Sequence, residues 1–224
     1  IWEMRAVPKN ENLTNQVYQT LKNRIINNEI MPNTYLDEKG LCDSLGASRT
    51  PVREALARLE QDGLVVSIPR RGVAVSELSL QTILELIHIR KVMEPSLLRP
   101  YFRLYDKNVL RTFRERQEQV IRDNDVDAFG LLDYEFHKYL YESTGKRHVI
   151  KLLSYVCDQH QRIRTHDFFR WRRLTQGAHD HLNIIDALLA DDYDLAYQLL
   201  VRQTSEMEEY YHGLLMNDVQ SYEF

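Results

Sequence analysis

Three side chains that can bind a divalent metal lie in two segments with helical patterning. Asp133 and His137 are four residues apart, so both point to the same face of one helix. The neighbours at helical spacing are apolar, namely Phe129, Phe136 and Leu140 in the first segment and Ile184, Ile185 and Leu188 after His181. One Asp and two His inside a helical bundle fit a metal with open positions. A hydrogen-bonded Asp–His pair with an unrelated core histidine fits the spacing at least as well.

A second group of chemically useful residues opens a short helical segment. Ser48, Arg49 and Thr50 stand at its start, where free N–H groups and the positive end of the helix dipole favour a phosphate. Arg49 and Arg53 are four residues apart and face away from the apolar stripe. This face can enter the major groove of DNA, where a guanidinium bonds to guanine O6 and N7.

Two further arginines occupy the tip of an expected hairpin. Arg70 and Arg71 are placed to reach a neighbouring groove or phosphate, and Gly72 allows the tight turn. Arginines on a helix are usually solvated surface. Here, a capped helix, paired arginines and a basic hairpin tip lie close together in the sequence, which favours a DNA-binding surface.

The elements that carry these arginines form an expected domain over residues 1–78. Apolar spacing predicts a helix capped by Thr14, a second opened by Asp37 or Glu38 and ended by Gly46, and a third capped by Ser48. Strand-like runs follow at residues 64–68 and 73–75. Two short helices around a tight turn, followed by a β-hairpin, are typical of a winged helix-turn-helix.

Residues 79–224 are expected to form an all-α helical bundle, so the whole fold is mostly α. Ser79 caps the first helix, which Pro95 and Pro100 must kink or end. The next five helices are expected at about residues 106–122, 125–144, 148–169, 174–190 and 193–217.

Composition and hydropathy indicate where in the cell the chain is expected to act. Its 224 residues have a formal net charge of −4, and residues 1–78 carry ten basic and ten acidic side chains. There is no apolar run of the ~18 residues that cross a bilayer and no signal-peptide pattern. Two distant cysteines, Cys42 and Cys157, are interpreted as small buried hydrophobic residues. We therefore expect a cytoplasmic protein with no membrane partner.

Residues 12–76 resemble the DNA-binding domain of the GntR family of transcription regulators. The matching residues are Glu38, Leu41, Leu45-Gly46, Ser48–Leu56, Leu59, Gly63–Val65, Pro69–Gly72 and Val75. The resemblance implies dimers on palindromic operators. It also implies DNA contacts from Lys39, Ser48, Arg49, Thr50, Arg53, Arg71 and Gly72.

The second domain resembles the ligand-sensing and dimerisation domain of the FadR subfamily. The matching residues are Arg90, Glu94, Asp133, His137, Asp180-His181, Ile184, Ala187, Asp192 and Ala196. Many members bind a metal such as Zn, Ni or Mn with one Asp and three His. Gln203 stands at the fourth ligand position, and an amide oxygen is a poor ligand for zinc or nickel. The implied site has three protein ligands plus water or effector, or it holds no metal.

Other polar residues of the second domain are candidates for effector binding. Arg90 follows an apolar stripe and can bind an effector carboxylate, or equally pair with Glu94 at i+4. Gln203 faces inward and is a second candidate. Arg162 and Arg164 can also reach the cavity, whereas His148, His160 and His166 are assigned to polar lining or surface.

The sequence thus predicts a non-enzymatic, ligand-responsive transcription regulator that binds an operator as a homodimer. Effector binding is expected to change the separation of the two DNA-binding heads. One alternative is a metal-free sensor similar to the acyl-CoA-binding branch of the subfamily. Another is a metal-dependent hydrolase using Asp133, His137 and His181, although no nucleophile or general base accompanies them.

Overall fold

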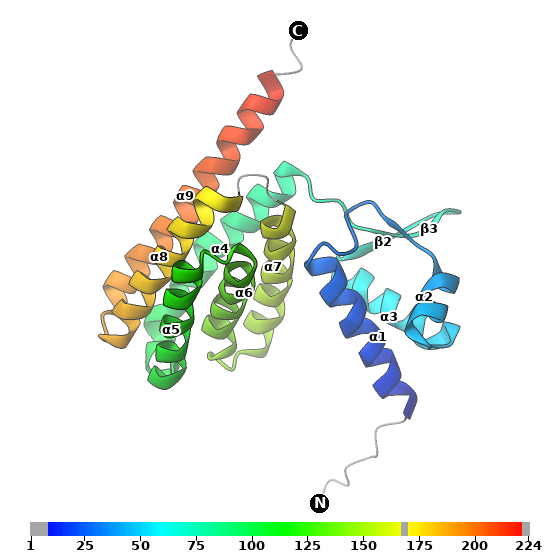
Figure 1. The fold of residues 1–224 in the computed structure, drawn as a ribbon, viewed down its shortest axis with the longest axis horizontal. Coiled ribbons are helices and arrows are strands. Elements are labelled where there is room, and N and C mark those ends of the chain that lie inside the picture. The colour runs from blue at the N-terminus through cyan, green and yellow to red at the C-terminus, as the bar shows by residue number, and fades with distance from the viewer. Residues whose placement is uncertain (1–8, 167–169, 221–224) are drawn as a thin grey trace, which may run out of the picture. The chain divides into compact units, whose positions relative to one another are not determined.

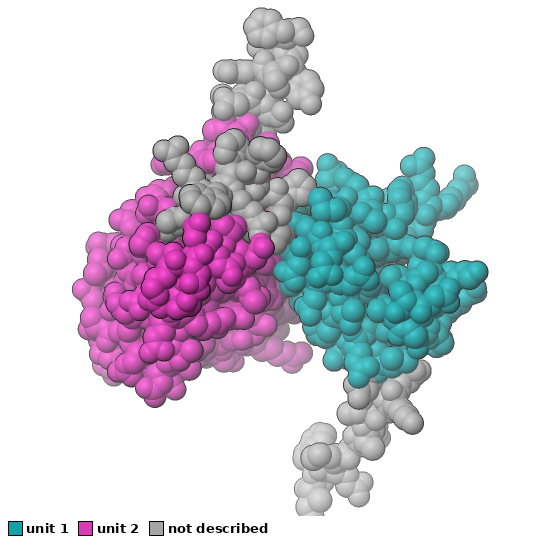
Figure 2. All heavy atoms as spheres, in the orientation of Figure 1, with its two compact units in different colours: residues 1–78 teal, residues 79–224 magenta. Residues whose placement is uncertain are grey.

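The computed structural model describes residues 9–166 and 170–220, and the chain forms two compact units (Figure 2). Residues 1–78 make up the first unit and residues 79–224 the second. The expected fold class is confirmed, since a helix-turn-helix with a small sheet precedes a helical bundle (Figure 1).

The first unit packs its helices against a small antiparallel sheet. Its elements are α1 (Lys9–Ile26), β1 (Tyr35–Leu36), α2 (Glu38–Leu45), α3 (Arg49–Gln61), β2 (Val65–Ile68) and β3 (Gly72–Val75). Helices α1 and α3 contact each other directly. The side chains buried between these elements include Leu21, Ile25, Val52, Ala55, Leu59 and Leu64. This core leaves the polar face of α3 in solvent.

Thr14 has a different role from the helix cap that the sequence predicts. Helix α1 begins at Lys9, so Thr14 lies inside it rather than at its start. Its buried Oγ1 donates a hydrogen bond to Glu54 Oε2 at 2.8 Å. Thr14 therefore links α1 to α3, a use of the hydroxyl that local sequence does not reveal.

The two helices of the helix-turn-helix start and stop largely where the sequence predicts. Asp37 caps α2 by accepting from the backbone N–H groups of Lys39 and Gly40, at 3.2 and 2.8 Å. Gly46 ends it at a positive φ of 60°, which glycine adopts without strain. Ser48 occupies the N-cap position of α3, but its side chain makes no capping hydrogen bond. The N-terminal N–H groups of α3 therefore do not use this hydroxyl.

The wing is a three-stranded sheet with strand order β1-β3-β2, whereas the sequence predicts only a hairpin. Both pairings are antiparallel, with Tyr35 opposite Ala74 and Val65 opposite Val75. The turn between β2 and β3 places Arg70 at a φ of 65° and Gly72 at 99°. Strand β1 has only two residues, too few to give a period-two pattern.

The second unit is helical throughout its described residues. Its elements are α4 (Leu80–Tyr101), the 3-10 helix η1 (Phe102–Leu104), α5 (Lys107–Asp123), α6 (Val126–Glu142), α7 (Arg147–His166), α8 (Arg170–Leu189) and α9 (Tyr193–Gln220). Ser79, Asp106 and Asp125 cap α4, α5 and α6 by accepting backbone N–H groups, which confirms the cap expected at Ser79. The expected end of one helix at Phe169 lies outside the described residues.

Helix α4 continues through Pro95, so of the two expected outcomes, a kink or an end, this proline does not end the helix. The helix terminates at Tyr101, one residue after Pro100. Pro95 is buried together with Leu97 and Leu98, so tertiary packing outweighs the lost backbone hydrogen bond. Helix α4 contacts α6, α7 and α9, which makes it a central element of the unit.

The two cysteines differ in accessibility, so only one matches its sequence interpretation. Cys157 is buried, whereas Cys42 is only half-buried. Burial raises the pKa of the Cys157 thiol to about 12.

We therefore expect a maleimide or disulfide reagent at pH 8 to label Cys42 in the folded protein and to leave Cys157 unmodified. Thiolate is the reactive form, so a buried protonated thiol reacts only after unfolding. Peptide mass spectrometry with and without urea measures this difference. Equal labelling of both cysteines in the native protein would contradict the packing of α7.

Candidate functional site

The residues proposed to contact DNA lie on the solvent side of the first unit. Ser48, Arg49, Thr50 and Arg53 are exposed on α3, opposite its buried face. The hairpin tip is likewise exposed at Arg70, Arg71 and Gly72, as is Lys39 on α2. No side chain of this set turns into the core, so all are available to a ligand of the first unit.

One contact within this surface was not anticipated from the sequence. Arg53 Nε donates to Glu38 Oε2 at 2.9 Å, which joins the second turn of α3 to the first residue of α2. The two residues lie 15 positions apart, so no local helical spacing predicts this contact.

The three predicted metal ligands come together in the core of the second unit. His181 Nε2 lies 3.2 Å from His137 Nε2 and 3.2 Å from Asp133 Oδ1. His137 Nε2 lies 3.8 Å from the same Asp133 oxygen. All three residues are buried, and their candidate ligand atoms fall within 4.8 Å of one another. Helices α6 and α8 thus bring together a compact set of one carboxylate and two imidazoles.

Two further side chains orient the imidazoles from neighbouring helices. Glu94 Oε2, on α4, lies 3.0 Å from His137 Nδ1. Gln117 Nε2, on α5, lies 3.0 Å from His181 Nδ1. Four helices therefore contribute to the cluster, and each imidazole has a polar partner on the nitrogen that points away from Asp133.

The charges in this region favour a neutral His137 beside an ionised Glu94. Burial and the positive Arg90 lower the pKa of His137, although the nearby Glu94 raises it. Burial raises the pKa of Glu94, but Arg90 and His137 together lower it by more, so the net pKa falls well below its usual value. An ionised Glu94 can accept the single proton of a neutral imidazole at Nδ1, which leaves a lone pair on Nε2.

Arg90 is enclosed in a polar chain that continues from Glu94. Its Nε and Nη2 donate to the two Glu94 oxygens at 2.9 and 3.2 Å, and it is only 2% exposed. Its Nη1 lies 2.9 Å from His160 Nδ1, and His160 Nε2 lies 2.9 Å from Met207 Sδ. The sequence predicts that Arg90 binds an effector carboxylate or pairs with Glu94, and the structure contains the pairing with Glu94. His160 belongs to the buried lining rather than to the surface.

Two other expected lining residues are also buried. Gln203, on α9, has a buried Oε1 with no hydrogen-bond partner among the described residues. Arg162, on α7, is fully buried, and its Nη1 donates to Gln159 Oε1 at 2.7 Å. Burial lowers the pKa of Arg162 to about 10. The side chains of Arg164 and His166 lie outside the part that the structure describes.

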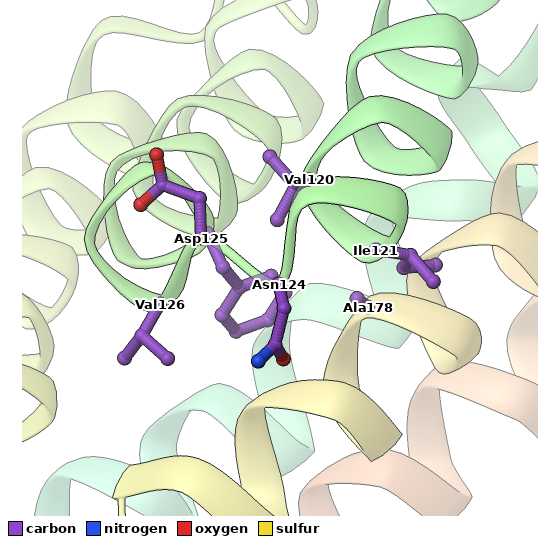
Figure 3. A pocket seen from close by; sticks show the side chains of 7 residues that line it. Val120, Ile121, Asn124, Asp125, Val126 and Ala178 are labelled. Carbon is purple, nitrogen blue, oxygen red and sulfur yellow. The ribbon is translucent and has the colours of Figure 1, made fainter.

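A small surface pocket lies near the cluster, where the turn between α5 and α6 meets α8 (Figure 3). Its lining residues are Val120, Ile121, Asn124, Asp125, Val126, Phe129 and Ala178. The Phe129 ring also stacks on His181, with ring centroids 5.7 Å apart. Phe129 therefore contacts both the pocket and the cluster.

Comparison with known proteins identifies both units. The model for the gntR family of bacterial regulatory proteins matches residues 13–75, and the FCD domain model matches residues 85–204. The chain belongs to the GntR family. It is a transcriptional regulator with an FCD domain, an architecture consistent with the FadR subfamily.

Individual relatives of this GntR regulator agree with the family match. The HTH-type regulator YdhC of Bacillus subtilis is 31% identical to this chain over 64% of the chain's length. The matched region covers 66% of YdhC, just under two thirds of it. The HTH-type repressor RspR of Escherichia coli is 25% identical over 87% of this chain and 86% of its own length. A solved chain described as a GntR regulator of Rhodococcus sp. RHA1 has a TM-score of 0.80 at 25% identity, covering 89% and 97% of the two chains.

These relatives are named as transcription regulators, which agrees with the expectation of a non-enzymatic GntR protein. In the described residues, no helix has the length and apolar character needed to span a membrane.

Two features of the candidate metal site were not predicted from the sequence, namely Gln117 as a partner of His181 and the contact of Glu94 with His137. Neither residue shares a helix with its histidine, and Gln117 stands among charged residues that resemble a solvated face.

Proposed function

We propose that this regulator binds a palindromic operator as a homodimer through the exposed face of α3 and the wing. The observation that supports this proposal is the exposure of four arginines on one compact unit, namely Arg49, Arg53, Arg70 and Arg71. Arg49 and Arg53 read base edges in the major groove, while Arg70, Arg71 and Gly72 approach a neighbouring groove or phosphate. Ser48 and Thr50, at the start of α3, and Lys39, on α2, bind phosphate oxygens.

In the FCD domain, Asp133, His137 and His181 are proposed to hold one divalent cation. The facing Nε2 atoms of the two histidines, 3.2 Å apart, support this proposal. Glu94 Oε2 beside His137 Nδ1 places the His137 proton on Nδ1, whereas the Gln117 amide N–H donates to His181 Nδ1 and so places the His181 proton on Nε2. A cation bound between the two Nε2 atoms would replace the His181 Nε2 proton and take one lone pair from each imidazole. Two nitrogens and one carboxylate oxygen suit zinc, nickel or manganese.

The effector is proposed to be a small carboxylate that enters this same site. A metal held by three protein ligands supplies a Lewis acid with open positions for carboxylate oxygens. Gln203 supports this assignment, because its buried Oε1 has no partner among the described residues and can accept a hydroxyl or protonated group. Glu94 holds the His137 imidazole in the tautomer that binds a metal through Nε2, and Arg90 keeps Glu94 ionised. Binding of the effector then changes the separation of the two DNA-binding heads.

A metal-free sensor is the second candidate, and Gln203 is the observation in its favour. A glutamine at this position is a weaker ligand for zinc or nickel than an imidazole. In this alternative the Asp133 carboxylate accepts a hydrogen bond from His181 and no cation is needed.

Metal analysis distinguishes the two candidates. We expect protein purified without chelator, or equilibrated with Zn²⁺, Ni²⁺ or Mn²⁺ and dialysed, to retain about one ion per chain, measured by plasma mass spectrometry. His181→Ala should weaken affinity by more than the roughly 10- to 100-fold typical for loss of an outer-shell partner. The control is His179→Ala, which alters an exposed histidine on the same helix. A wild-type protein that retains none of the three ions would favour the metal-free sensor.

A further inference from the structure

The contact between Glu38 and Arg53 lies on the face proposed to read DNA. Arg53 Nε lies 2.9 Å from Glu38 Oε2, and the two side chains are 63% and 36% exposed. An ion pair this exposed contributes little to stability, because water and salt screen it. Because the ion pair lies on the exposed face of α3, we expect it to act in DNA recognition rather than in folding stability.

Local structure leaves the Glu38 carboxylate available for this contact. The N-terminal N–H groups of α2 at Lys39 and Gly40 are already bonded to Asp37. Glu38, the first residue of α2, is therefore not needed as a cap. Its carboxylate extends to α3 instead, so two adjacent acidic residues have separate roles.

Holding Arg53 through Nε has a direct chemical consequence. A guanidinium presents its donors in a rigid planar fork, and fixing Nε orients the opposite edge, formed by Nη1 and Nη2. Among the described residues, the Arg53 guanidinium makes no other hydrogen bond. The free edge carries two donors and matches guanine O6 and N7, whereas adenine offers one acceptor and one donor at the same edge.

The negative charge of Glu38 also opposes a less specific use of Arg53. An arginine without an acidic neighbour can bind any backbone phosphate, whatever the sequence. A carboxylate beside the guanidinium repels an approaching phosphate and tolerates the neutral edge of a base. Specificity of this kind arises from repulsion of the wrong contact as well as from attraction to the right one.

We propose that Glu38 is a specificity-determining residue that positions Arg53 to read a guanine. This inference rests on the proposed role of Arg53 in base recognition. It extends that role by assigning a second side chain, one that does not itself bond to the base.

Selection from a random-sequence duplex library, followed by sequencing, tests the proposal with the full chain. The wild type should prefer guanine roughly 5- to 150-fold at one base pair of each half-site. Both Glu38→Ala and Arg53→Ala should abolish that preference at the same base pair and leave the others unchanged. The double variant should match Arg53→Ala, because Glu38 acts through Arg53. Glu38→Gln, which keeps an acceptor, should retain part of the preference.

Glu29→Ala is the matched control, since Glu29 pairs with Arg24 in the same unit at 3.6 Å. It should leave the selected motif unchanged, and circular dichroism should give the same melting temperature for all variants. If Arg53→Ala alters the motif and Glu38→Ala does not, the role of Glu38 is wrong while that of Arg53 stands. If neither alters the motif, both roles are wrong.

Discussion

Replacing Arg49 by alanine is expected to weaken operator binding by about 1–3 kcal/mol per half-site, a loss of roughly 5- to 150-fold. Arg49 is exposed at the first position of α3, where its guanidinium can reach base edges. Its loss should also relax the base preference at the contacted position. Fluorescence anisotropy with a duplex selected by the wild type, at one fixed salt concentration, measures the change.

Arg24→Ala is the control for this experiment. Arg24 belongs to the last turn of α1 and pairs with Glu29, so its removal lowers the net charge by the same amount away from α3. We expect this variant to change affinity only slightly. Equal losses for the two variants would mean that general charge, rather than contact by α3, determines binding.

The second large effect is expected at Glu94, in the core of the FCD domain. Glu94→Leu leaves the Arg90 guanidinium buried without its carboxylate, and removal of one partner from a buried ion pair costs about 3–5 kcal/mol. The free energy of unfolding, from urea titration at fixed protein concentration, measures this loss. Because the folded pKa of Glu94 is lowered, its contribution is complete above the unfolded pKa of about 4.3 and declines as the pH falls below it.

A double-mutant cycle separates the ion pair from simple loss of packing. Arg90→Met combined with Glu94→Leu removes both charges and keeps apolar volume, so it should cost much less than Glu94→Leu alone. The surface pair of Arg114 with Glu118 offers a comparison with the same spacing, and Glu118→Leu should change stability far less than Glu94→Leu does. Additive losses at Arg90 and Glu94 would contradict a coupled buried pair.

Local patterns were sufficient to predict most of the fold. The apolar spacing of α3 and the glycines at 46 and 72 are short-range signals, and the structure follows them. Strand β1 was not predicted from the sequence, because its two residues are held by pairing with β3, almost forty positions away. Thr14 was misassigned for a similar reason, since its partner Glu54 lies 40 residues along the chain.

The candidate metal site shows the same division between local and long-range information. Asp133 and His137 share one helical face, and His181 opens an apolar stripe, so spacing predicts that all three point inward. The partners that orient the imidazoles are Glu94 on α4 and Gln117 on α5. Which helices pack together decides those contacts, and spacing within one helix carries no information about it.

The structure of the full chain bound to a selected duplex tests the proposed DNA-binding surface most directly. We expect the N-terminus of α3 in the major groove, with the Arg49 and Arg53 guanidinium groups about 3 Å from guanine O6 and N7. Arg71 should lie at the neighbouring groove or phosphate, in a two-fold symmetric dimer. A complex in which α3 faces away from the duplex, or in which these arginines contact no part of it, would contradict the proposal.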